Sequence, residues 1–192
     1  MKKFFISALI VSPLLMFAGT SPAGEVSQSQ PSDPLSMERW FVGDWVCKGT
    51  QQMSPHGPEI KFTDKFVFRM VLDDTWLLFH IDQLEGPLKG KRSLIGSSTW
   101  DAYSHLHIRR DMNIGSSRMD MTTPGWAGDR LVFSGFMTTG DDGLAVEQVF
   151  TRKTAAEYEA SMKVTDAAGT VLAWEEEDCR RIRSEGPKIS GH

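Results

Sequence analysis

The sequence predicts an all-β protein: an up-and-down antiparallel β-barrel of about ten strands with a short N-terminal helix. From Gly43 onward, apolar and polar residues alternate with period two, as in half-buried strands. Turn sequences recur at hairpin spacing, and GDDG at 140–143 is one of the strongest. Ten consecutive antiparallel strands close most simply as a barrel, because closure removes exposed edges. A two-sheet sandwich is the alternative.

Residues 1–23 have the layout of a secretory signal peptide. A basic start, MKK, precedes the apolar run FFISALIVSPLLMF, and Ser21 and Ala23 are the small residues of a cleavage site. The run is shorter than the ~20 residues that a bilayer requires and contains a proline. We therefore expect a secreted, periplasmic protein with no membrane anchor after cleavage. The formal net charge of -4, without a basic stripe, argues against a nucleic-acid partner.

The mature chain reads as one domain. Residues 24–34 form a polar, flexible leader, residues 35–183 the barrel domain, and residues 184–192 a disordered tail. Asp33 and Pro34 are a helix start, and LSMERWF gives one or two helical turns before Gly43. The segment 154–164 is rich in Ala and Glu, which favour helix, but we assign a strand because the alternating pattern resumes after it. The strands are expected at 43–52, 59–72, 75–86, 92–100, 105–114, 116–123, 130–139, 144–153, 156–165 and 171–182.

Cys47 and Cys179 are the two cysteines of an exported chain, so a disulfide is the default expectation. No C-x-x-C pair or Cys/His cluster supports a redox or metal role. Because the first and last strands of a closed barrel are neighbours, the two cysteines can pair across the seam. Such a long loop allows about 4–5 kcal/mol of stabilisation. The same topology brings Arg181 near Trp45 as a cation–π partner, with Arg180 and Arg183 as the alternatives in another register.

Several segments carry a family resemblance: MERWFVGDWVCKG, DTWLLFHID, LKGKRSLIGSSTWDAYSHLHI and DRLVFSGFMTT. A short helix followed by FVGDW resembles the start of calycin barrels, in which a Gly-x-Trp step opens the first strand. Together the segments resemble the DUF1579-type lipocalin-like proteins over residues 35–182, with Trp100 in place of the usual Tyr. The resemblance implies that Trp45 closes one end of a barrel and that a last-strand arginine pairs with it. It implies a fold and no established activity.

A barrel of this size can hold one small molecule, and by analogy of fold we expect a small apolar ligand inside it. Its rival is a structural or interaction protein with a filled barrel. His80 is the candidate axial ligand for a haem alternative, although a lone strand histidine is more often a core residue. Otherwise no cofactor is expected. The candidate ligand-binding residues are Trp45, Phe66, Phe68, Met70, Trp76, Leu78, His80 and Arg181.

No metal or catalytic site is expected. His105 and His107 share a strand face with Asp111, but Arg109 on the same face would repel a cation. The run EEED at 175–178 reads as a strand with an exposed charged face, and no nucleophile or acid–base constellation accompanies it. The glycines at 86, 90 and 96 are not followed by a helix, as a phosphate loop requires. The sequence therefore favours a binding protein over an enzyme, and an uncharacterised enzyme is the further rival class.

Overall fold

A computed structural model describes residues 33–140 and 142–182 of the chain. The expected signal peptide, nearly all of the leader and the C-terminal tail lie outside the described residues. Among the described residues, no helix has the length and apolar character needed to cross a membrane.

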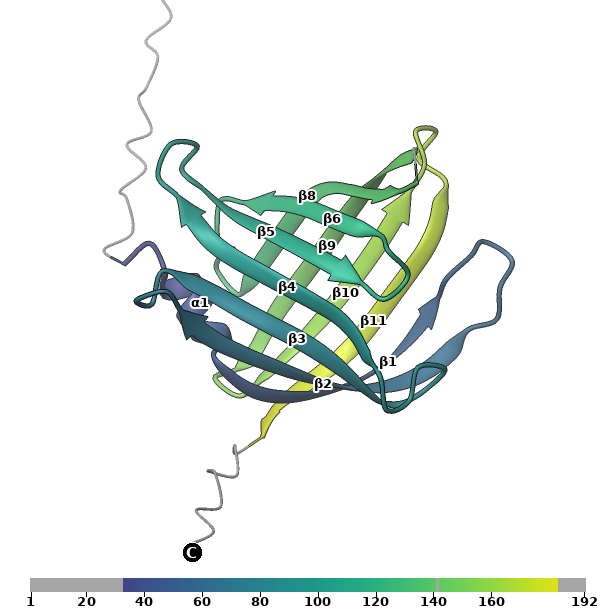
Figure 1. The fold of residues 1–192 in the computed structure, drawn as a ribbon, viewed down its shortest axis with the longest axis horizontal. Helices are drawn as coiled ribbons and strands as arrows, with labels where there is room; N and C mark the ends of the chain where they lie inside the picture. The colour runs from purple at the N-terminus through teal and green to yellow at the C-terminus, as the bar shows by residue number, and fades with distance from the viewer. Residues whose placement is uncertain (1–32, 141, 183–192) are drawn as a thin grey trace, which may run out of the picture. The chain divides into compact units, whose positions relative to one another are not determined.

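The described chain folds into one antiparallel sheet that closes on itself (Figure 1). Each strand pairs with the next along the chain, except that β6 pairs with β8 and not with the two-residue strand β7. The first strand, β1, pairs with the last, β11. Ten strands form the barrel wall, so the predicted barrel is confirmed. The strands are β1 (Gly43–Gln52), β2 (Ile60–Val71), β3 (Trp76–Glu85), β4 (Arg92–Asp101), β5 (Leu106–Asn113), β6 (Arg118–Thr123), β7 (Trp126–Ala127), β8 (Arg130–Thr139), β9 (Asp142–Thr154), β10 (Glu157–Thr165) and β11 (Val171–Ile182).

Alternation along the strands separates the interior from the solvent. In β2, Phe66 and Phe68 are buried, whereas the alternate residues Lys65, Val67 and Arg69 point outward. In β10, Tyr158, Ala160 and Val164 are buried with the same period of two, so the helical alternative for 154–164 is wrong. Pairing with β9 and β11 outweighs the helix propensity of Ala and Glu there.

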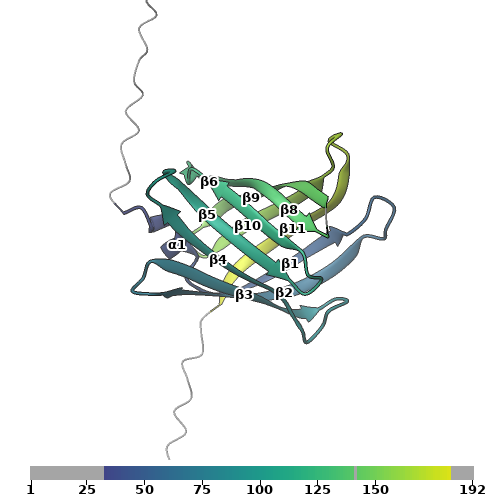
Figure 2. The ribbon, with the colours of Figure 1, turned by 45° about the horizontal axis from the view of Figure 1, so that its top comes forward.

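The helix α1 (Ser36–Phe41) lies at one end of the barrel in both views (Figures 1 and 2). Met37 and Phe41 of α1 are buried in the core, and the Trp45 indole Nε1 donates a hydrogen bond to the Phe41 carbonyl at 2.8 Å. Gly43 makes the turn into β1 with φ of 129°, in the left-handed region that favours glycine. Trp45 is completely buried, so its expected position as an aromatic plug is confirmed.

The seam between β1 and β11 is fastened covalently. Cys47 and Cys179 are direct cross-strand partners and form the expected disulfide, with 4.0 Å between their Cα atoms. The register also decides between the candidate arginines. The Arg181 Cζ lies 4.3 Å from the Trp45 ring centroid, and its guanidinium donates to the carbonyl oxygens of Trp40 and Val42. Arg180 points outward.

Candidate functional site: the barrel interior

The predicted lining residues divide between two faces. Trp45, Phe66 and Phe68 are buried inside the barrel, and Met70 packs against the same core. Trp76, Leu78 and His80 lie on the outer face of β3, so their prediction as lining residues is wrong.

The register of β3 gives the reason for this correction. Leu77, Phe79 and Ile81 take the inward positions, whereas Leu78 is 44% exposed. Both faces of this strand are apolar, so alternation alone does not identify the inner one. His80 lies 3.4 Å from Asp82 on the outside, and burial together with Arg92 lowers its pKa. It cannot ligate a haem held inside the barrel.

The interior near α1, which we call the helix half, is a packed core. It contains Met37 and the aromatic residues Phe41, Trp45, Phe68 and Tyr158. The aromatic rings contact one another at centroid distances of 4.9–5.9 Å. A cavity of about 10 Å³ remains between α1, β2, β3 and β8. That is about the space of one water molecule, so this half leaves no room for a ligand of the expected size.

A buried polar contact ties α1 to the barrel wall. Glu38 is fully buried, and its Oε1 lies 2.8 Å from Nδ1 of His107 on β5 and accepts a hydrogen bond from Ser98 Oγ at 3.0 Å. His105 does not share this position, because it lies in the turn before β5 with φ of 56°. The two histidines therefore do not form a metal pair.

Arg109 and Asp111 form an ion pair inside the barrel. The guanidinium donates to both carboxylate oxygens of Asp111 at 2.7–3.0 Å and lies 4.6 Å from the Phe79 ring centroid. Gly96 makes room for this arrangement, since a Cβ there would lie 2.2 Å from Phe79 and 2.4 Å from Asp111 Oδ1. Arg109 and Asp111 therefore lie on one face of β5, as their spacing in the sequence indicates.

The other half of the interior, toward the strand ends opposite α1, holds three further carboxylates: Asp64 on β2 and Glu175 and Glu177 on β11. We call it the acidic half. Asp64 is 8% exposed and Glu177 5%. Burial raises the pKa of Asp64 to about 6, and Gln83 opposes the shift. Burial and the charge of Asp64 raise the pKa of Glu175 to about 7, and burial with both other carboxylates raises that of Glu177 well above its usual range.

Several buried oxygens of the acidic half lack a partner. Among the described residues, Asp64 Oδ1, Glu177 Oε2 and Gln148 Oε1 accept no hydrogen bond. The nearby cation, Arg109, donates to Asp111 instead. Unpaired buried acceptors are costly, so they mark a place where a donor is missing.

The apolar residues of the acidic half are flexible and partly accessible. Met137 and Met162 are partly buried and pack against the core, and Met119 pairs with Met137 across β6 and β8. Methionine adapts its shape to different neighbours, as at promiscuous binding surfaces. Leu94, Leu144 and Ala173 are partly buried around them.

The sequence contained a signal for this acidic cluster. Glu177 and Glu175 stand two and four residues before Cys179, and Cys179 must point inward to bond Cys47 across the seam. The prediction of an exposed charged face for EEED is therefore right for Glu176 and Asp178 and wrong for Glu175 and Glu177.

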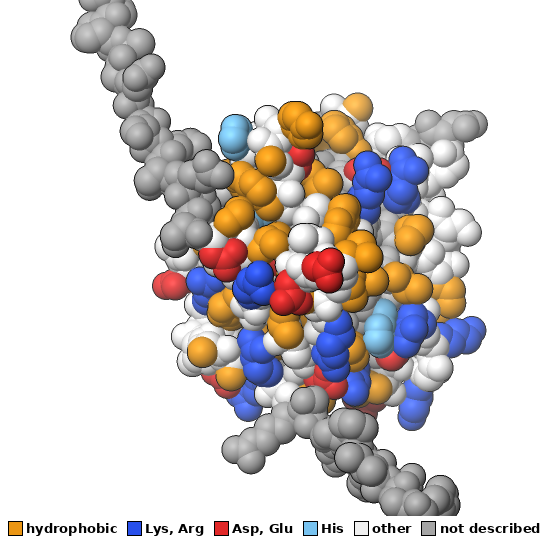
Figure 3. All heavy atoms as spheres, turned by 60° about the vertical axis from the view of Figure 1, so that its left-hand side comes forward, with side chains coloured by type: hydrophobic (Ala, Val, Ile, Leu, Met, Phe, Trp, Pro, Cys, Tyr) orange, Lys and Arg blue, Asp and Glu red, His pale blue; other side chains and the backbone are white. Residues whose placement is uncertain are grey.

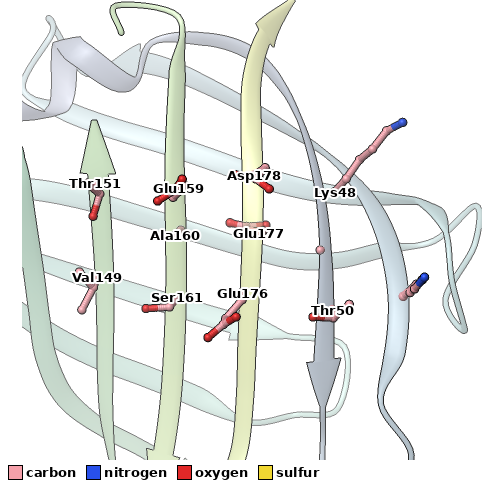
Figure 4. Close-up of a pocket in the computed structure, with 12 residues that line it drawn as sticks. Lys48, Thr50, Val149, Thr151, Glu159, Ala160, Ser161, Glu176, Glu177 and Asp178 are labelled. Carbon is pink, nitrogen blue, oxygen red and sulfur yellow. The ribbon is translucent and has the colours of Figure 1, made fainter. Parts of the chain in front are cut away.

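A second hollow lies on the outer surface of the barrel. Figure 4 shows its side chains spread over β9, β10, β11 and β1, including Glu159, Glu176, Asp178 and Lys48. Its volume is about 610 Å³, and most of its lining residues alternate with those of the core. Charges of both signs line it, so no single-sign ligand is favoured there. The face around α1 also mixes acidic, basic and apolar side chains (Figure 3).

Comparisons with known proteins agree with this architecture. No protein-family model and no curated protein sequence matches the chain. The solved structure of Rv2717c from M. tuberculosis superposes with a TM-score of 0.61 at 10% identity, covering 79% of this chain and 99% of that chain. The S-type phycobiliprotein lyase CPES from Guillardia theta gives 0.54 at 9% identity, covering 77% and 92%. At such identities the likeness establishes the fold alone: the chain is similar to these proteins as a lipocalin-like barrel.

Proposed function

We propose that the protein binds a small molecule inside the barrel, in the acidic half. The observation that carries this proposal is the set of unpaired buried oxygens on Asp64, Gln148 and Glu177. A protein with a filled barrel gains nothing from such groups, because their desolvation costs free energy without compensation. The helix half, in contrast, is closed and filled.

The ligand would enter at the end opposite α1. Met137, Met162 and Ala173 are only partly buried there and would contact the apolar part of a ligand. A barrel similar to that of a phycobiliprotein lyase agrees with a ligand-handling role, and the DUF1579 resemblance remains a prediction.

The expected export also belongs to this proposal. A fully buried disulfide suits an oxidising compartment such as the periplasm, as the first 23 residues indicate. If both thiols of exported, unfolded protein reacted with a maleimide before any reduction, the assignment would fail.

A binding assay with a neutral dye tests the proposal without assuming a charge on the ligand. Wild-type protein should bind Nile red saturably, with a blue-shifted emission. Ala173→Trp should block the inner face of β11 and abolish binding, whereas Ala145→Trp, on the exposed face of β9, should leave it unchanged. Absence of saturable dye binding, with no co-purifying small molecule in native mass spectra, would contradict the proposal.

The outer hollow favours a second candidate, an interaction protein. Its polar lining from β9, β10, β11 and β1 suits a protein segment rather than an apolar molecule. Under this alternative, Glu159→Lys and Glu176→Lys would abolish capture of a partner while Ala173→Trp would not.

A further inference from the structure

Three carboxylates share the acidic half without a cation of their own. Asp64 extends from β2, and Glu175 and Glu177 extend from the inner face of β11. The neighbouring interior charge, Arg109, makes three hydrogen bonds to Asp111 through its Nε and Nη2 atoms. The cluster therefore retains an uncompensated negative charge whenever its members ionise.

The unpaired atoms are acceptors. Asp64 Oδ1, Glu177 Oε2 and Gln148 Oε1 lack donors, and each of the three residues is more than nine-tenths buried and faces the interior. An ammonium group offers three donors and no acceptor, so it complements such a site in both charge and hydrogen bonding. An anion or a neutral acceptor would leave these oxygens unpaired.

The spacing of the carboxylates disfavours a bare metal ion. Among the described residues, the group of ligand atoms close enough to share an ion comprises Cys47, Glu177 and Cys179. Both of these sulfurs are bonded to each other in the disulfide. Calcium or magnesium would require several oxygens at 2.0–2.6 Å, whereas an amine tolerates carboxylates farther apart.

We propose that the ligand is an organic cation: a primary amine whose head lies among Asp64, Glu175 and Glu177 and whose apolar body lies against Met119, Met137 and Met162. The inference rests on the proposed function, since it requires that the interior bind a molecule at all. It adds the charge of the head group, which nothing in the apolar-ligand prediction supplied.

Three probes of equal chain length test the charge preference. Octylamine, octanol and octanoate carry a positive, a neutral and a negative head, and calorimetric titration at pH 8 measures each with the wild-type protein. Octylamine should bind at least tenfold more tightly than octanol, and octanoate should bind more weakly than both. If octanol or octanoate bound as tightly as octylamine, the charge inference would be wrong but the proposed function would be supported. If none of the three probes bound and Nile red did not bind either, both the charge inference and the proposed function would be wrong.

Variants of β11 supply a matched control. Glu175→Gln with Glu177→Gln keeps the side-chain shape and should reduce octylamine affinity at least tenfold while leaving octanol affinity unchanged. Glu176→Gln with Asp178→Asn removes the same charge from the outer face of the same strand and should change neither the octylamine affinity nor the octanol affinity. If both double variants weakened octylamine equally, long-range charge rather than the interior site would explain the preference, and the inference would be wrong.

Discussion

The two halves of the barrel interior use burial in opposite ways. In the helix half, the Trp45 indole and the Arg181 guanidinium have hydrogen-bond partners, and packing leaves about 10 Å³. Glu38 Oε1 is paired there with Ser98 and His107, whereas Glu38 Oε2 has no partner. In the acidic half, Asp64 and Glu177 are buried without donors for all their oxygens. The helix half therefore stabilises the fold, whereas the buried carboxylates of the acidic half lower its stability and are suited to a ligand.

Loss of the disulfide should be the largest single effect. Cys47→Ala with Cys179→Ala frees a loop of 132 residues, and the free energy of unfolding should fall by about 4–5 kcal/mol. Guanidinium unfolding of the variant and the oxidised wild type measures the difference. A change below about 0.5 kcal/mol would show that the seam is held by strand pairing alone.

Truncating Trp45, the aromatic plug of the helix half, should lower the free energy of unfolding nearly as much as loss of the disulfide. Trp45→Ala leaves a cavity under α1 and should lower the free energy of unfolding by about 3–5 kcal/mol. Trp174→Ala is the control, because Trp174 lies on the outer face of β11 and donates to Gln52 Oε1. If both variants lost the same stability, the helix half would not be the main packed core.

The buried carboxylates of the acidic half should make the free energy of unfolding depend on pH. In the folded state the pKa of Asp64 is about 6 and that of Glu175 about 7, above their ordinary values of 3.8 and 4.5. The folded state therefore holds protons that the unfolded state releases. Their stabilising contribution is therefore complete below about pH 4 and is lost as the pH rises through 7.

Neutral variants test this dependence directly. Glu175→Gln with Glu177→Gln should flatten the pH profile of unfolding between pH 4.5 and 8 and raise stability at pH 8. Glu176→Gln with Asp178→Asn should keep the wild-type slope, because both residues are exposed. An unchanged slope in the inner-face variant would mean that these carboxylates are solvated.

The smallest expected effect concerns the arginine over the plug. Arg181→Met removes a cation–π contact and two hydrogen bonds to α1 and the following residue, and should lower the free energy of unfolding by about 1–2 kcal/mol. Arg180→Met, on the exposed side of β11, should change it by less than about 0.5 kcal/mol. If both variants lost the same free energy of unfolding, Arg181 would not help to close the helix half.

The sequence predicted most of the fold because turn signals and alternation are local. All ten expected strands need no more than small boundary changes, and the two-residue strand Trp126–Ala127 is the one that the sequence did not predict. The inward face of β3 could not be predicted, since Leu77 and Leu78 are equally apolar. The buried Glu177 could be reached only through its spacing from Cys179, because charged residues are rarely buried without a partner.

The unpaired oxygens could not be predicted at all. They depend on where Arg109 donates, and its pairing with Asp111 on the same strand leaves Asp64 and Glu177 without it. Such competition between side chains on distant strands appears only when the barrel closes.

Methionine methyl signals give the most direct test that ligand binding belongs to the acidic half. In protein labelled with ¹³C at the methionine methyl groups, titration with octylamine should shift the signals of Met119, Met137 and Met162. The signals of Met37, a buried residue of α1, and of Met112 on the outer surface should not move. Shifts confined to Met37 or Met112, or no shift at any concentration that saturates calorimetric binding, would contradict the account.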